Sequence, residues 1–351
     1  MQNRVYQNLG NLYKNSPSFP LNKKDKMVIM SDMHMGSGDN KDDFNANATL
    51  FASVLRNYYL EKGYSLVLNG DIEELQRFEF NQIYKKWKSI YKLFDKFAQK
   101  QQLFKTVGNH DIALITQEYK QYPYQVHESI LLKYKNEHDI FIFHGHQASR
   151  KYTLQNALIG YTLRYLANPL GIKNYSVAHS SRKKYKIEKT AYDFSREHKV
   201  MSIIGHTHRP LFESLPKPER IRFRIEQLIR EYSNKEWTGN GRLVKLIESY
   251  KEELRYIHRQ SREYQNLYNE ILHVPCLFNS GCVIGKRGIT CLEITNGKIR
   301  LVHWFDKKIS KKYLHHTGYK PQQLGDSDFF RLLISKEKLS YIFTRINILA
   351  G

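Results

Sequence analysis

The sequence has few cysteines and no long apolar run. Its three cysteines, Cys276, Cys282 and Cys291, are an odd number in 351 residues and lie in strand-like sequence, which argues against a disulfide framework. We expect reduced, partly buried thiols in a cytoplasmic protein, with neither a catalytic nor a zinc-binding role. No apolar segment approaches the ~18–20 residues that cross a membrane. Residues 1–22 are polar, so we expect no signal peptide.

Acidic residues are also scarce relative to basic ones. The chain has 34 Asp and Glu against 56 Lys and Arg, a formal charge of +22, which favours anionic partners. Phosphorylated substrates, nucleic acid and acidic membrane surfaces all fit this charge, and so does an ordinary lysine-rich surface. A hydrophobic share of 41% is enough for a sizeable core, which excludes an intrinsically disordered chain.

Short apolar runs alternate with helical patterns in the first part of the chain. The strand-like runs are residues 26–30, 65–68, 103–107, 128–134 and 139–143, the last two forming a hairpin around Asn136 and Glu137. Residues 44–62 and 80–100 have apolar positions at helical spacing. The alternation predicts an α/β fold, in which ligands bind at the carboxyl ends of strands.

The remaining segments have less regular patterns. Residues 1–25 read as an irregular arm, because Pro17 and Pro20 break any helix. We expect one insertion at about 147–199, with an apolar helix over 154–170 and a basic stretch over 180–190. A second insertion, at about 213–272, is predicted to form two charged helices, 219–233 and 241–270, joined by a turn at 238–241.

The end of the chain returns to strand patterns. Residues 275–305 read as strands, and Asn296-Gly297 is a strong hairpin signal. The tail, residues 307–351, is basic and then weakly helical over 329–348. We treat residues 1–351 as a single domain with a core at about 26–306.

Polar clusters follow four of these apolar runs and a further apolar run over residues 200–204. They are Asp32-x-His34, Gly70-Asp71, Gly108-Asn109-His110-Asp111, His144-Gly145-His146 and Gly205-His206-Thr207-His208. Two imidazoles at the mouth of a buried strand are costly unless they bind something. In extended segments, residues i and i+2 point the same way, so each Asp-x-His or His-x-His pair can reach one site. Mixed oxygen and imidazole ligands suit manganese, iron or zinc better than calcium or magnesium.

These five clusters, in this order, resemble the calcineurin-like metallophosphoesterase superfamily over about residues 27–306. The resemblance implies a four-layer αββα sandwich and two divalent metal ions, for which we favour manganese. It places one ion on Asp32, His34, Asp71 and His208. It places the other on Asp71, Asn109, His144 and His206, so that Asp71 bridges the two ions.

The resemblance also implies a mechanism, in which a metal-bridging hydroxide hydrolyses a phosphate mono- or diester or a pyrophosphate. His110 is then placed to protonate the leaving oxygen or to stabilise developing charge. Glu74, three residues after Asp71, matches the carboxylate that holds such a histidine; its alternative role is that of a glutamate in the first turn of a helix.

The substrate stays open among several classes. The insertion before the last cluster is similar to that of the UDP-2,3-diacylglucosamine hydrolases of lipid A synthesis, where it shelters acyl chains. In this chain Arg164 and the basic residues 182–186 could meet a diphosphate or, peripherally, the anionic inner face of the membrane. However, that subfamily has arginine at the position of His110. A second hypothesis is a nuclease or nucleotide phosphodiesterase, and a third is a non-catalytic metal-containing binding module. The sequence does not predict the oligomeric state.

Overall fold

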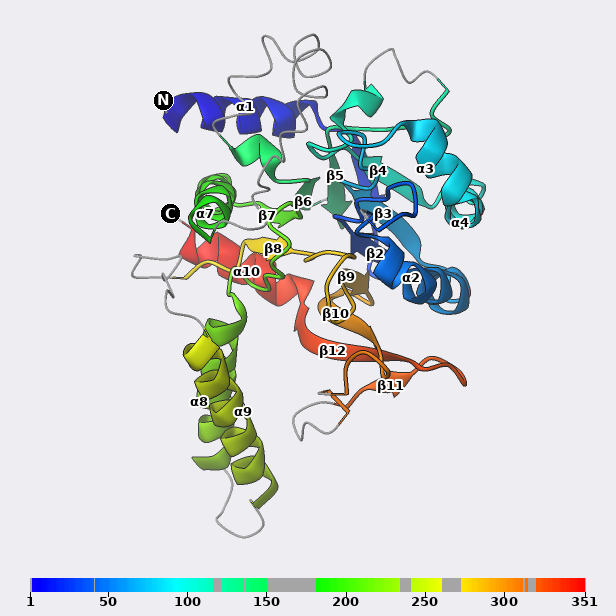
Figure 1. Ribbon diagram of the computed structural model, residues 1–351. Coiled ribbons are helices and arrows are strands. Elements are labelled where there is room, and N and C mark those ends of the chain that lie inside the picture. The colour runs from blue at the N-terminus through cyan, green and yellow to red at the C-terminus, as the bar shows by residue number, and fades with distance from the viewer. Residues whose placement is uncertain are drawn as a thin grey trace.

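The structure is a computed structural model, and it describes most of the chain. The described residues are 2–40, 42–115, 121–135, 137–149, 181–233, 241–260, 273–311, 313–314 and 320–350. They contain eight α-helices and two mixed β-sheets (Figure 1). None of the helices in these ranges combines the length and the apolar character that a membrane crossing requires.

The larger sheet has seven strands in the order β11-β12-β10-β9-β2-β3-β4. Strands β2 (Lys26–Met30), β3 (Ser65–Asn69) and β4 (Leu103–Thr106) are parallel, and β9 (Ile289–Thr295) joins β2 in the antiparallel sense. Strands β10 (Lys298–Asp306), β12 (Phe329–Lys338) and β11 (Gln322–Gln323) complete the sheet. The parallel strands therefore all end at one edge, which is where loops can converge.

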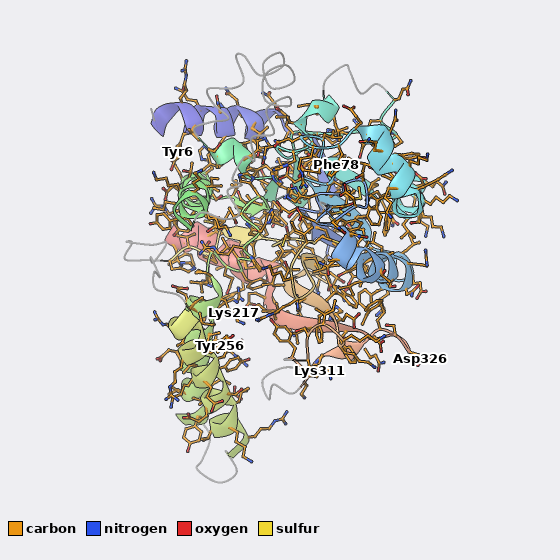
Figure 2. The ribbon with its side chains drawn as sticks, in the orientation of Figure 1. Tyr6, Phe78, Lys217, Tyr256, Lys311 and Asp326 are labelled. Carbon is orange, nitrogen blue, oxygen red and sulfur yellow. The ribbon has the colours of Figure 1, made fainter. Side chains whose placement is uncertain are left out.

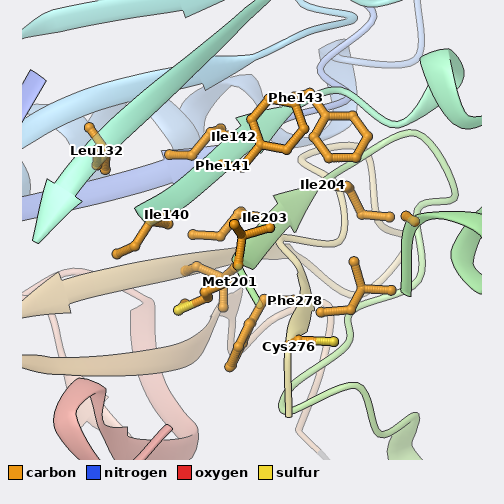
Figure 3. Close-up of a cluster of buried hydrophobic side chains, with 14 of the residues drawn as sticks. Leu132, Ile140, Phe141, Ile142, Phe143, Met201, Ile203, Ile204, Cys276 and Phe278 are labelled. Carbon is orange, nitrogen blue, oxygen red and sulfur yellow. The ribbon is translucent and has the colours of Figure 1, made fainter. Parts of the chain in front are cut away.

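The smaller sheet has five strands in the order β1-β5-β6-β7-β8. They are β1 (Ser18–Leu21), β5 (Ser129–Tyr134), β6 (His138–Phe143), β7 (Met201–Ile204) and β8 (Leu277–Asn279). Strands β6, β7 and β8 are parallel, whereas β5 and β6 form the antiparallel pair that the sequence predicts. Figure 3 shows the apolar side chains that β5, β6, β7 and β8 contribute to the core.

The two sheets and their helices form an α/β sandwich, as predicted (Figure 1). Side chains of β2 alternate between two cores: Met27 and Ile29 face the smaller sheet, whereas Val28 and Met30 face helices α2 (Ala48–Val54) and α4 (Lys88–Ala98). Helices α1 (Gln2–Asn15) and α7 (Ser181–Glu197) pack on the smaller sheet, where Tyr13 and Phe194 contact Phe141. Helix α3 (Phe80–Lys86) precedes α4 and is separated from it by Trp87.

A helical arm leaves this body after the last polar cluster. Helices α8 (Lys217–Ser233) and α9 (Gly241–Gln260) pack against each other and extend away from the sheets (Figure 1). Lys217 lies at the root of the arm and Tyr256 on its side (Figure 2). Lys217 forms an ion pair of 2.6 Å with the buried Glu253, which joins the two helices near that root. The predicted helix over 219–233 is thus confirmed, and so is the predicted helix over 241–270 as far as residue 260; residues 261–270 lie outside the described ranges.

The expectation of an irregular N-terminal arm is wrong. Residues 2–15 form α1, whose Val5 and Leu9 lie one turn apart and are buried against the smaller sheet. Pro17 follows the end of this helix, where proline is tolerated. Pro20 lies in β1, which is an edge strand of the smaller sheet, and edge strands accommodate proline.

The expectation of a helix beginning at Phe329 is also wrong. Residues 329–338 form β12, which pairs with β10 along its whole length, and only residues 339–349 form a helix, α10 (Leu339–Leu349). Arg331 of β12 is buried in an ion pair of 2.5 Å with Glu293 of β9, and this pairing requires β12 to lie within the sheet. The predicted hairpin at Asn296-Gly297 is confirmed by the antiparallel β9–β10 pair.

Two predicted features lie outside the described residues. They are the apolar helix over 154–170, with Arg164, and most of the turn at 238–241. Residues 181–190 of the predicted basic stretch form the first half of α7.

Candidate metal centre

The predicted ligands follow the carboxyl ends of five parallel strands from both sheets. Asp32 and His34 follow β2, Asp71 follows β3 and Asn109 follows β4. In the smaller sheet, His144 follows β6, and the pair His206 and His208 follows β7. The packing of the two sheets therefore brings residues separated by up to 176 positions in the chain to one place.

Five of these seven residues have a left-handed backbone. Their φ angles are 54° for Asp32, 47° for His34, 53° for Asp71, 65° for His206 and 54° for His208. A non-glycine residue pays about 1–2 kcal/mol for this conformation. Such strain persists only where the surrounding structure imposes it, and it concentrates at functional sites.

Two groups contain predicted ligands alone. Atoms of Asp32, His34 and His208 lie within 4.8 Å of one another, and so do atoms of Asp71, His144 and His206. A third group, His34, Asp71 and His110, links these two through His34 and Asp71.

Asp71 lies between the two groups. Its Oδ2 is 3.0 Å from Nε2 of His144 and 3.9 Å from Nε2 of His34. A carboxylate in this position can serve both ions.

Oδ1 of Asn109 is a buried atom that has no hydrogen-bond partner among the described residues. A buried polar atom without a partner is costly, so native structures seldom contain one without a reason. Two carboxylates, four imidazoles and an amide oxygen are ligands that first-row divalent ions accept. The residues present therefore fit a pair of such ions.

Backbone and carboxylate contacts orient the imidazoles toward the centre. Nδ1 of His144 lies 2.8 Å from the carbonyl oxygen of Asn69, and Nδ1 of His34 lies 3.0 Å from Oε2 of Glu74. In both rings the bonded Nδ1 leaves Nε2 as the nitrogen that faces the ligand groups. This is the arrangement in which protein histidines usually bind metals.

The charges of the cluster shift the pKa values of its members. Burial opposes ionisation of Asp71, but the imidazoles of His144, His110 and His34 hold its pKa well below the usual range. Burial likewise lowers the pKa of His34 and His144, yet the neighbouring carboxylates overcome it and raise both values to about 9. Without metal, these two histidines are thus imidazolium groups at neutral pH.

The pKa of His206 shifts in the opposite direction to those of His34 and His144. Burial, followed by repulsion from His144, lowers its pKa to about 3. It is therefore neutral at physiological pH and already in the form that ligates a metal.

Glu74 and His110 lie together at the edge of the centre. Oε1 of Glu74 accepts a hydrogen bond of 2.8 Å from Nδ1 of His110, while Oε2 contacts His34. Burial raises the pKa of Glu74, but its bonds to the two histidines lower it to about 2, so the carboxylate is ionised. The structure thus brings together the pair that the sequence singled out; its catalytic role remains a prediction.

Glycines allow the loops to approach each other. A Cβ on Gly108 would lie 2.0 Å from Oδ1 of Asp71 and 2.5 Å from its backbone nitrogen. Gly70 has a φ of +78°, and a Cβ there would lie 2.5 Å from Nδ1 of His144. No side chain larger than hydrogen fits at either position without moving a predicted ligand.

Sequence reasoning missed two acidic residues that hold the loops. Asp111, in the same cluster as Asn109, accepts hydrogen bonds from the backbone of the Asp71 loop. Glu188 of α7 is fully buried and accepts a hydrogen bond of 2.6 Å from Thr207, between the two histidines of the last cluster. The only signal for Glu188 was that it is the single acidic residue in the basic stretch 180–190, which does not reveal its partner.

Comparison with known proteins agrees with this geometry. The family model for calcineurin-like phosphoesterases matches residues 26–212, more than half of the chain. The match contains all seven predicted ligands, from Asp32 to His208. The comparison with curated proteins found no match. With its α/β sandwich and its buried Asp and His cluster, the chain belongs to the calcineurin-like phosphoesterase family.

Proposed function

We propose that this protein is a phosphoester hydrolase that holds two divalent metal ions, with Mn²⁺ favoured. The observation that carries the proposal is that Asp71 lies close to His144 and His206 and also to the neighbouring group Asp32, His34 and His208. Ions bound there would supply Lewis acidity, which acidifies water and offsets charge on phosphoryl oxygens.

Residues of the chain would handle the proton of the leaving group. Glu74 is ionised and holds Nδ1 of His110, which leaves Nε2 to exchange a proton with the substrate. The His110 side chain is 16% exposed, whereas those of Asp71 and His144 are at most 2% exposed. A substrate can therefore reach His110 more easily than Asp71 or His144, and His208, at 17%, is similarly exposed.

The positive charge near the centre favours a substrate with more than one anionic group. Helix α7 packs against β7 and against the short helical turn His146–Ala148, so its first half lies beside the centre. Burial lowers the pKa of Lys184 on this helix, while attraction to Glu188 and Asp32 opposes the shift. The ammonium group of Lys184 is half-buried and is attracted to Asp32, so it suits a diester or a diphosphate substrate. The acyl-sheltering role of 154–170 in a lipid A enzyme concerns residues outside the described ranges and stays a prediction.

The first test is hydrolysis of bis-p-nitrophenyl phosphate with Mn²⁺ added. Asp71→Asn is the matched control, because it removes one charge but keeps the shape of the side chain. We expect turnover by the wild type and a loss of at least about 100-fold in the variant, since Asp71 serves both ligand groups. Wild-type protein that binds Mn²⁺ but cleaves no ester would refute the proposal and favour the non-catalytic binding module.

A second assay separates the substrate classes. Release of UMP from UDP-2,3-diacylglucosamine in detergent would support a role in lipid A synthesis. Cleavage of bis-p-nitrophenyl phosphate without UMP release would exclude that role and direct the search to nucleotides and nucleic acids. For those, strong salt dependence of binding is the expected signature.

A further inference from the structure

A lysine is fully buried behind the metal centre. Lys105 lies in β4 between Phe104 and Thr106, and its side chain has no exposed surface. Its Nζ is 2.7 Å from Oε2 of Glu73 and 3.2 Å from Oδ2 of Asp111, and both carboxylates are also fully buried. A buried lysine is rare unless its charge is paired, and the mechanism above makes no use of this one.

Asp111 connects this lysine to the loops of the centre. Its Oδ1 accepts hydrogen bonds from the backbone nitrogens of Gly108, at 2.6 Å, and Asp71, at 3.2 Å. Its Oδ2 accepts a third bond from the nitrogen of Ile72, at 2.9 Å. One carboxylate thus joins the loop after β3 to the loop after β4, and it binds the backbone of the residue proposed to bridge the ions.

Glu73 anchors the other side of Lys105. Its Oε1 accepts hydrogen bonds from the hydroxyl groups of Tyr91, at 3.0 Å, and Tyr122, at 2.7 Å. Both oxygens of Glu73 are therefore occupied, and the ammonium group is held between two fixed carboxylates. Without that cation, Glu73 and Asp111 would be two buried negative charges facing each other in a medium of low dielectric constant.

We propose that Lys105 is a positioning residue of the metal centre: by neutralising Asp111 and Glu73, it fixes the two loops that place Asp71 and Asn109. Lys105 acts through Asp111 and does not touch the ligand side chains. The inference rests on the proposed function, because it assumes that the cluster binds metal. It predicts that loss of the lysine charge weakens metal binding in protein that is still folded.

Arg331 provides a matched control. It is also a buried cation that pairs with a buried carboxylate, Glu293, in the same sheet. Strand β12 is five positions away from β4 in this sheet, which corresponds to roughly 24 Å at a strand spacing of about 4.8 Å. Arg331→Met leaves one buried carboxylate without its cation and Lys105→Met leaves two, so both variants destabilise the fold, but only Lys105→Met disturbs the loops of the centre.

The test measures Mn²⁺ affinity by isothermal titration calorimetry at a temperature at which circular dichroism shows each variant folded. We expect Lys105→Met to bind Mn²⁺ about 10–100-fold more weakly than the wild type, as for other residues that orient metal ligands. We expect Arg331→Met to bind within about twofold of the wild type, because additivity holds for distant sites. If Lys105→Met does not fold, Lys105→Gln keeps a donor toward Asp111 without the charge and should show a smaller loss.

Three outcomes would overturn the inference, and they can be told apart. Normal Mn²⁺ affinity in a folded Lys105 variant would refute the positioning role and leave the proposed function intact. Absence of Mn²⁺ binding by the wild type would refute the proposed function itself, and the inference with it. An equal loss of affinity in Arg331→Met would show that general destabilisation is the cause.

Discussion

Metal binding by this protein should be linked to the release of protons from His34 and His144. In the metal-free protein, burial lowers their pKa values, but Asp71, Asp32 and Glu74 together raise them to about 9. Both rings therefore carry a proton at pH 7, and each must lose one before Nε2 can bind an ion. The two histidines belong to different ligand groups, so each ion displaces about one proton.

The size of the effect follows from this proton count. Release of one proton for each ion changes the apparent affinity by about tenfold for each pH unit below 9, or about 100-fold between pH 6 and pH 8. Above about pH 9 the affinity should level off, because the imidazoles are then already neutral.

The thermal stability of the metal-free protein should change in the opposite direction. The folded-state pKa values of His34 and His144, about 9, exceed the ordinary value for histidine of about 6.5. Their contribution to stability is thus fully present below about pH 6.5 and is lost as the pH rises through about 9. The melting temperature of the metal-free protein should fall over this pH range. The difference in melting temperature between the metal-loaded and the metal-free protein should increase over the same range.

The assay is titration of Mn²⁺ by calorimetry at pH 6, 7 and 8, in two buffers with different ionisation enthalpies. The buffer dependence of the heat counts the protons released. His206→Ala is a suitable control, because His206 has a pKa of about 3 and carries no proton to lose. This variant should bind more weakly but with an unchanged pH dependence. An affinity that does not vary between pH 6 and pH 8, or heats independent of the buffer, would refute the reasoning.

Two further variants test the centre by other routes. His110→Ala should lower kcat for bis-p-nitrophenyl phosphate by about 10²–10⁴-fold, the usual contribution of a general acid. Its Mn²⁺ affinity should be nearly unchanged, and a loss of Mn²⁺ affinity as large as the loss of kcat would instead identify His110 as a metal ligand. Gly108→Ala should abolish Mn²⁺ binding, because the new Cβ would lie 2.0 Å from Oδ1 of Asp71. Gly10→Ala is the control, because no atom lies within 4 Å of its new Cβ; it should bind Mn²⁺ normally and melt at a slightly higher temperature. Normal Mn²⁺ binding by Gly108→Ala would contradict this prediction and show that the loops after β3 and β4 can separate.

The identity of the candidate ligands was readable from the sequence. Each cluster follows a short apolar run that ends abruptly in Gly, Asp, Asn or His, and such runs are strands whose carboxyl ends meet at one edge of a sheet. The structure places all seven predicted residues after such strand ends, in both sheets, and brings six of them, all but Asn109, into groups of ligand atoms within 4.8 Å of one another. The helices and strands around them were predictable for the same reason, since the apolar periodicity of 44–62, 65–68 and 103–107 is local.

Elements whose apolar faces need a distant partner were not predictable in this way. In helix α1 the buried apolar side chains are those of Val5 and Leu9, and their burial depends on the smaller sheet beneath them. Strand β12 contains Arg331, which looks like a surface residue until Glu293 of β9 supplies its partner. In both cases local sequence preference was weaker than tertiary packing.

The sequence by itself therefore determined which residue types follow which strands, and with them the family and the chemistry that the centre can perform. Only the tertiary structure decided how those residues are held. It imposes a left-handed backbone on five predicted ligands, turns Nδ1 of His144 toward Asn69, and pairs Lys105 with Asp111 and Glu73. The physical reason is that strain, orientation and charge pairing depend on contacts between segments far apart in the chain, and no local pattern records such contacts.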